Sequence, residues 1–226
     1  MSILRLLHIA DSSFPSGVFA HSWGLEYAIV QGWVHDVASL EAWLSDCVTH
    51  YLIPLEGLAA QKAYVLAAAG DYEHLVQLDR DLASYRINLA SREAAAQMGR
   101  SFLTAVNAIW KHDLLLKLAA FGETSSTALQ HAVAWGATAA VMEIPPQTML
   151  ESFLIGTLRQ FCTVAMRLIP LGQTDANLVL ARLLQRLERQ TLVEKSPLSV
   201  DLASNLPGMD IAVLGHENLK ARYFRS

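Results

Sequence analysis

Apolar residues recur with the period of an α-helix along most of this 226-residue chain. In residues 37–51 they fall on one face of an amphipathic helix, and Asp36 stands just before it as a candidate N-cap. Pro54 is expected to interrupt the pattern, because a proline inside a helix lacks the N–H that the helix needs. A second helix is predicted to follow it and to stop at Gly70, after which Asp71 caps the next one.

The same periodicity continues through the second half of the chain. Further helices are expected at residues 92–110 (opened by Ser91), 128–142 and 146–169, and from a cap at Thr174 or Asp175 onward. Residues 122–127 are small and polar and are predicted to form a loop, whereas no alternating β-branched run predicts a strand. The pattern therefore predicts an all-α, single-domain bundle of roughly eight to ten helices.

Two segments lack this periodicity. The first is the turn at residues 11–19, within the N-terminal segment of residues 1–22, and its Phe14 and Phe19 are expected to be exposed. The second, the tail of residues 196–226, is broken by prolines and ends in a basic and aromatic run. Because aromatic residues and arginine anchor protein interfaces, the tail is predicted either to dock on a partner or to fold back on its own domain.

Composition narrows the class of protein. Hydrophobic residues make up 53% and charged residues 17%, which excludes disorder, and the formal charge of -4 argues against nucleic acid as the main partner. The low charge indicates either apolar surface reserved for partner proteins or a large helical core. Cys47 and Cys162 lie far apart, which is typical of buried cytosolic thiols. With neither a signal peptide nor a membrane span recognisable, a soluble cytoplasmic protein is expected.

Motifs for catalysis, metal binding or nucleotide binding are not recognisable. Asp46, Cys47 and His50 form the best local cluster for a metal, but Cys47 belongs to the apolar stripe, so packing is favoured. The chain has no phosphate-binding glycine loop and no nucleophile elbow. Glu26 and Asp79 are predicted to be helix-surface or capping acids. A non-catalytic interaction protein without tightly bound cofactors is therefore expected.

Two alternatives stay open. The first is an all-α small-molecule sensor or enzyme with a buried pocket, which needs convergent polar groups on facing helices. Asp46 and His50 are the only hint of such groups. The second is a peripheral membrane protein, for which a helix over residues 176–190 offers Arg182, Arg186 and Arg189 on one face.

Six short stretches, in order along the whole chain, resemble the UreF family of urease accessory proteins. They are LLHIADS (6–12), FPSGVFAHSWGLE (14–26), SRE (91–93), GRS (99–101), IPLGQTD (169–175) and HENLKARYFRS (216–226). Val18 departs from the family pattern, which usually has a second glycine there. Either the turn at Gly17 needs only one glycine, or this loop differs locally.

The resemblance implies an all-helical, non-enzymatic, cytoplasmic scaffold that forms a homodimer. Members of this family assemble with UreD (also called UreH) and the GTPase UreG to install nickel in apo-urease, with UreE as nickel donor. Nickel and GTP are handled by the partners.

The resemblance also implies roles for individual residues. The residues that would face or support UreD are His216, Glu217, Arg222, Tyr223, Phe224 and Arg225. Near the N-terminus, those that would lie near partner surfaces or support them are Phe14, Phe19, His21 and Glu26.

Overall fold

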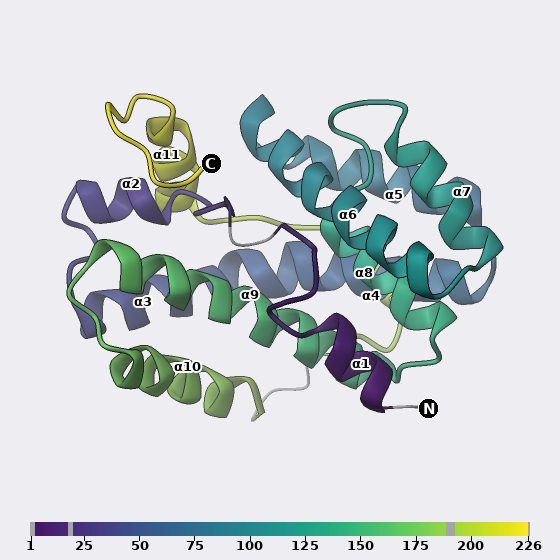
Figure 1. Ribbon diagram of the computed structural model, residues 1–226, viewed down its shortest axis with the longest axis horizontal. Helices are drawn as coiled ribbons and strands as arrows, with labels where there is room; N and C mark the ends of the chain where they lie inside the picture. The colour runs from purple at the N-terminus through teal and green to yellow at the C-terminus, as the bar shows by residue number, and fades with distance from the viewer. Residues whose placement is uncertain (1–2, 18–19, 189–192, 226) are drawn as a thin grey trace.

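The computed structural model describes residues 3–17, 20–188 and 193–225, and helices run through most of these ranges (Figure 1). In chain order the elements are α1 (Ile3–Ile9), α2 (Leu25–Val30), α3 (Val37–Cys47), the π-helical stretch η2 (Val48–Gly57), α4 (Leu58–Ala68), α5 (Tyr72–Ser84), α6 (Leu89–Ile109), α7 (Asp113–Gly122), α8 (His131–Val141), α9 (Pro146–Leu168), α10 (Gln173–Glu188), the short 3-10 turn η3 (Pro197–Ser199) and α11 (Pro207–His216). No strand occurs in the described ranges, and the predicted all-α class is confirmed.

The long helix α9 crosses the middle of the molecule (Figure 1). It packs against α2, α3, α4, α8 and α10. The N-terminal segment between α1 and α2 passes across α9, and the C-terminal segment lies beside α2 (Figure 1). The two irregular ends of the sequence therefore meet on one side of the bundle.

The expected helix break at Pro54 is wrong. α3, η2 and α4 form one helical run, in which the backbone N–H of Leu58 donates to the carbonyl of Ile53, five residues earlier. Proline has no N–H to donate, and the wider π-helical turn carries the helix past Pro54. The tail also contacts the carbonyls of His50 and Pro54. The N–H of Asn205 donates to the His50 carbonyl at 3.0 Å, and the N–H of Ala203 donates to the Pro54 carbonyl at 3.1 Å. The tail thus binds the carbonyls of the wide turn.

The helix starts follow the predicted caps in part. Asp36 and Asp71 cap α3 and α5 through their carboxylates, and Pro146 opens α9, as predicted. Ser91 is not a cap: Asn88 caps α6, and its side-chain oxygen accepts from the Ser91 N–H at 2.9 Å. α10 begins at Gln173, before both residues expected to cap it.

Four of the observed helices, α1, α2, α7 and α11, were not predicted by residue range. α1 lies just before the turn expected at residues 11–19, and α11 lies within the tail. In α1, Leu6 and Ile9 are buried, but Leu4 and Leu7 are exposed. Because apolar residues lie on both faces of this short helix, its sequence shows no amphipathic pattern. The remainder of the tail is irregular, as expected, apart from the three residues of η3.

The tightest helix contact joins α4 and α8. A Cβ built on Gly136 of α8 would overlap the carbonyl oxygen of Ala60 in α4, so only glycine allows this approach. Cys47 and Cys162 are free, buried thiols, as the sequence indicated.

Gly136→Ala is expected to lower the free energy of unfolding by about 1–3 kcal/mol, because the added methyl must push α4 and α8 apart. Gly156→Ala is the matched control, since Gly156 also lies inside a long helix but a Cβ there meets no atom within 4 Å. That variant is expected to gain about 1 kcal/mol from helix propensity. Urea unfolding measures both, and equal shifts would contradict the described α4–α8 contact.

Candidate partner-binding site

A buried carboxylate joins the N-terminal and C-terminal segments. Glu26 of α2 is 1% exposed and accepts three hydrogen bonds, all from the last eleven residues of the chain. The donors are His216 Nε2 at 2.9 Å, the Tyr223 N–H at 2.7 Å and the Phe224 N–H at 3.2 Å. Because a buried charge needs such donors, this carboxylate holds the tail in place. The prediction that Glu26 lies on a helix surface is wrong.

Two glycines bring α2 and α11 close enough for these bonds. Gly24 has a φ of 82°, and a Cβ on it would lie 2.9 Å from the Cβ of Ala212 in α11. A Cβ on Gly215 would overlap the ring of Tyr27. Both glycines are therefore required by the contact between the two helices.

Further contacts fix the residues after α11. The Arg225 N–H donates to the Ala20 carbonyl at 2.9 Å, and the Asn88 amide donates to the Glu217 carboxylate at 2.8 Å. Phe224 is 5% exposed, with the guanidinium carbon of Arg167 5.9 Å from the centre of its ring. The tail is therefore folded back on its own domain, which is one of the two predicted arrangements.

Of the tail residues predicted to bind a partner, four are exposed: Glu217, Arg222, Tyr223 and Arg225. Tyr223 is 81% exposed. Exposed apolar residues on the outer faces of α2 and α11 are Val30, Ile211 and Leu214. Since His216 and Phe224 are buried, they hold the segment, while the exposed side chains are available to a partner.

The N-terminal turn is mostly packed inward. Phe14 was expected to be exposed, but it is 6% exposed and its ring lies 5.6 Å from that of Phe102. Gly17 has a φ of 73°, the left-handed conformation expected of a turn glycine. Burial, and then the charge of Arg225, lowers the pKa of His21 to about 4. The predictions on Val18 and Phe19 fall outside the described residues.

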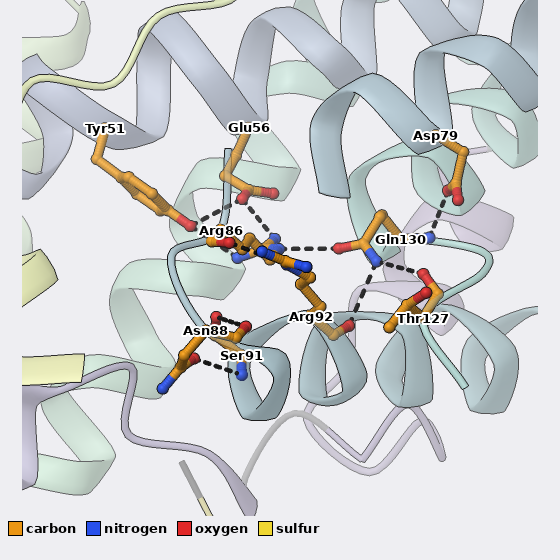
Figure 2. Close-up of polar contacts among 9 residues, drawn as sticks. All are labelled: Tyr51, Glu56, Asp79, Arg86, Asn88, Ser91, Arg92, Thr127 and Gln130. Carbon is orange, nitrogen blue, oxygen red and sulfur yellow. Dashed lines mark hydrogen bonds and ion pairs between the residues drawn. The ribbon is translucent and has the colours of Figure 1, made fainter. Parts of the chain in front are cut away.

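A second buried polar cluster lies at the centre of the bundle (Figure 2). Arg86, between α5 and α6, donates to Glu56 at 2.6 Å, to the Tyr51 hydroxyl at 2.8 Å and to the Gln130 side-chain oxygen at 2.8 Å. The Arg86 and Glu56 side chains are 4% and 8% exposed. Three separate segments are thus tied together by one guanidinium group.

Asp79 extends the hydrogen bonding to the loop before α8. Its carboxylate accepts from the backbone N–H groups of Leu129, at 2.9 Å, and Gln130. Leu129 has a φ of 71°, which strains a residue other than glycine, so these bonds stabilise an unfavourable turn. Burial raises the pKa of Asp79 to about 6 despite them. The expectation that Asp79 lies on a helix surface is therefore wrong.

Sequence reasoning missed the central cluster because its members are distant along the chain. A signal exists: Glu26 and Glu56 are each a single charge inside an apolar run, WGLEYAIV and LIPLEGLAA. Such a charge is either exposed on one face or buried with a partner, and here both are buried.

Other candidate sites find less support. In the described part of the chain, no group of three or more His, Cys, Asp or Glu residues could hold a metal ion. The described helices include none long and apolar enough to cross a membrane. Arg182 and Arg186 both pair with Glu41 of α3, at 2.8 and 3.0 Å, which explains the basic face of α10 by helix packing. Arg189 lies outside the described residues.

A pH dependence follows from His131, the first residue of α8. Burial, and then the charge of Arg86, lowers the pKa of His131 to about 4, against about 6.5 in an unfolded chain. As the pH falls, the imidazole takes up a proton in the unfolded chain before it does so in the folded one. The stability that the neutral, buried His131 contributes is therefore fully present above pH 6.5 and is lost as the pH falls toward 4. When the pH falls from 7 to 4.5, the free energy of unfolding of the wild type is expected to drop by about 2 kcal/mol more than that of His131→Phe.

Urea unfolding at both pH values measures this difference. The other buried titratable groups, including His21 and Asp79, are present in both proteins and cancel in the comparison. Parallel stability curves for wild type and His131→Phe would contradict the burial of a neutral imidazole.

Comparisons with known proteins agree with the sequence motifs. The model of the UreF family matches residues 34–184. A urease accessory protein UreF from Azorhizobium caulinodans is 33% identical over 227 residues, covering 100% of this chain and 96% of the relative. One from Rhodopseudomonas palustris is 34% identical over 228 residues, covering 100% and 93%. One from Bacillus sp. (strain TB-90) is 28% identical over 224 residues, covering 99% of both. The chain therefore belongs to the UreF family of urease accessory proteins.

Proposed function

We propose that this chain is a non-catalytic scaffold for nickel incorporation into urease. In this role it joins UreD (UreH) and the GTPase UreG in the activation complex of apo-urease, in the cytoplasm and as a homodimer. Nickel and GTP are handled by those partners, and this chain supplies binding surfaces whose affinity depends on the partner's state.

The observation that carries the proposal is the folded C-terminal segment. It exposes Arg222, Tyr223 and Arg225, the residue types that dominate interface energetics, from a backbone held on a buried carboxylate. A segment already ordered loses little conformational entropy on binding. The exposed apolar residues of α2 and α11 extend the same side of the molecule.

Tyr223→Ala combined with Arg225→Ala is expected to weaken binding to UreD by at least about 2 kcal/mol, or roughly thirtyfold. Both side chains are exposed, so the helical circular dichroism should not change. Co-expression with UreD followed by pull-down measures the loss.

The matched control is Leu116→Ala with Lys117→Ala, which removes one exposed apolar side chain and one exposed cation from α7. In Figure 1, α7 lies at the far side of the bundle from the tail. Wild-type recovery of UreD by the tail variant, or equal loss by the control, would remove the tail from the interface.

A further inference from the structure

A cavity of about 90 Å³ lies beside the central polar cluster. It is bordered by the N-terminal segment, η2, α6, α8 and α9, with Arg86 and Glu56 on one side. Ser12 and Arg159 border both this cavity and a groove between α9 and α10, so the cavity lies next to that surface groove. None of the exposed tail residues lines it.

Aromatic rings form one part of the remaining wall. Phe102, His131, Trp135 and Phe153 contact one another, with ring centres between 5.3 and 6.3 Å apart. Trp23 lines the cavity too, with the Arg86 guanidinium 5.0 Å from its ring centre. Stacked and edge-to-face contacts with such walls favour an aromatic guest.

Gly156 keeps the cavity open. It lies inside the 23-residue helix α9, where glycine costs about 1 kcal/mol relative to alanine. Gly99 and Gly136 are required by close backbone contacts, whereas a Cβ on Gly156 would meet no atom within 4 Å. No neighbouring atom therefore requires a glycine at position 156. What the missing side chain does is leave the cavity beside α9 unfilled.

Four charged residues line the cavity, Arg86 and Arg159 with Glu56 and Asp11, so their formal charges balance. The guanidinium of Arg86 is paired with the Glu56 carboxylate and also donates to Tyr51 and Gln130. His131 lies close enough to Arg86 for that charge to disfavour a second cation, and its imidazole is neutral near pH 7. A bound cation would lie near Arg86 and Arg159, and a bound anion near Glu56 and Asp11, so an uncharged molecule avoids both repulsions.

His131 is a polar side chain on the wall that is available for hydrogen bonding. Ser152 and Thr157 donate their hydroxyls to carbonyls of their own helix, at 2.9 and 3.0 Å. The ring nitrogens of His131, by contrast, have no hydrogen-bond partner among the described residues and make only ring contacts. A neutral imidazole both donates and accepts.

We propose that this cavity binds an uncharged molecule built on a single aromatic ring, whose hydroxyl or N–H group hydrogen-bonds to His131. An apolar cavity of about 150 Å³ holds benzene, so the smaller volume here takes one ring at most. This binding is additional to the scaffold role and does not depend on it.

Titration of the full chain with 4-fluorophenol, followed by fluorine NMR, tests the proposal. We expect saturable binding, with fluorobenzene and the cation 4-fluorobenzylamine each binding about tenfold more weakly, since each loses one favourable feature. His131→Phe should lower the affinity for 4-fluorophenol to that for fluorobenzene, and leave fluorobenzene unchanged.

Gly156→Leu, which fills the cavity, should abolish binding. Ser152→Leu provides a second filling variant, and Glu151→Leu, on the exposed face of α9, should bind as the wild type does. Absence of saturable binding by the wild type, or unchanged affinity in a folded filling variant, would overturn the proposal.

Discussion

Glu26→Ala is expected to release the C-terminal segment from the bundle while leaving the helices in place. It removes the acceptor of three hydrogen bonds and leaves His216, 2% exposed, without its partner. Breaking a buried pair of this kind costs about 3–5 kcal/mol, and the cost falls on the contact between the tail and α2. Amide hydrogen exchange measures it: protection of Tyr223 and Phe224 should fall by at least about 100-fold.

Two variants control for this effect. Glu26→Gln keeps one acceptor oxygen, so it should retain part of the protection. Glu41→Ala removes a carboxylate that pairs with Arg182 and Arg186, and it should leave the tail amides unchanged. Full protection in Glu26→Ala would show that burial of Phe224, rather than the carboxylate, holds the tail.

Arg86→Met is expected to lower the free energy of unfolding by about 3–5 kcal/mol, the other large effect. The substitution leaves the Glu56 carboxylate, 8% exposed, without its cation and removes the bonds to Tyr51 and Gln130. Against a total of about 5–15 kcal/mol for a domain, this loss is severe. Urea unfolding followed by circular dichroism measures it.

The double variant Arg86→Met with Glu56→Met separates charge from packing. Replacing both ions of a buried pair by apolar groups of similar volume is often neutral, so at least half of the lost stability should return. A loss below about 1 kcal/mol in Arg86→Met would contradict the described network, because each bond of a charged group contributes more than that.

Local signals predicted the helices where side chain and backbone interact within one turn. Asp36 and Asp71 accept from N–H groups three residues later, and Pro146 occupies the first position of α9. These effects need no knowledge of the rest of the chain. Together with the apolar periodicity, they account for the correct prediction of an all-α fold.

Pro54 shows where local rules fail. The rule that proline ends a helix assumes that nothing outside the helix supports the backbone around it. Here the N–H of Asn205, more than 150 residues away along the chain, donates to the His50 carbonyl. No pattern within the helix itself reveals that the C-terminal segment passes there.

In the candidate site, too, the local sequence predicted some features, and contacts between distant segments determined the others. Residue types at the C-terminus identified Arg222, Tyr223 and Arg225 as binding candidates, but not which side chains face inward. Burial of Phe224 and Glu26 depends on the close approach of α2 and α11, and the bond between Glu26 and His216 spans 190 residues. The central cluster likewise joins Arg86 to Glu56 and Gln130 across 30 and 44 residues.

The most direct test of the scaffold role is the nickel content of urease purified from cells that lack this chain. Urease should be nickel-free in those cells and nickel-loaded when the wild type is restored. Tyr223→Ala with Arg225→Ala should leave urease largely nickel-free, and Leu116→Ala with Lys117→Ala should restore loading. Fully loaded urease in cells without this chain would contradict a role in nickel incorporation, and full loading with the tail variant would contradict the proposed tail interface.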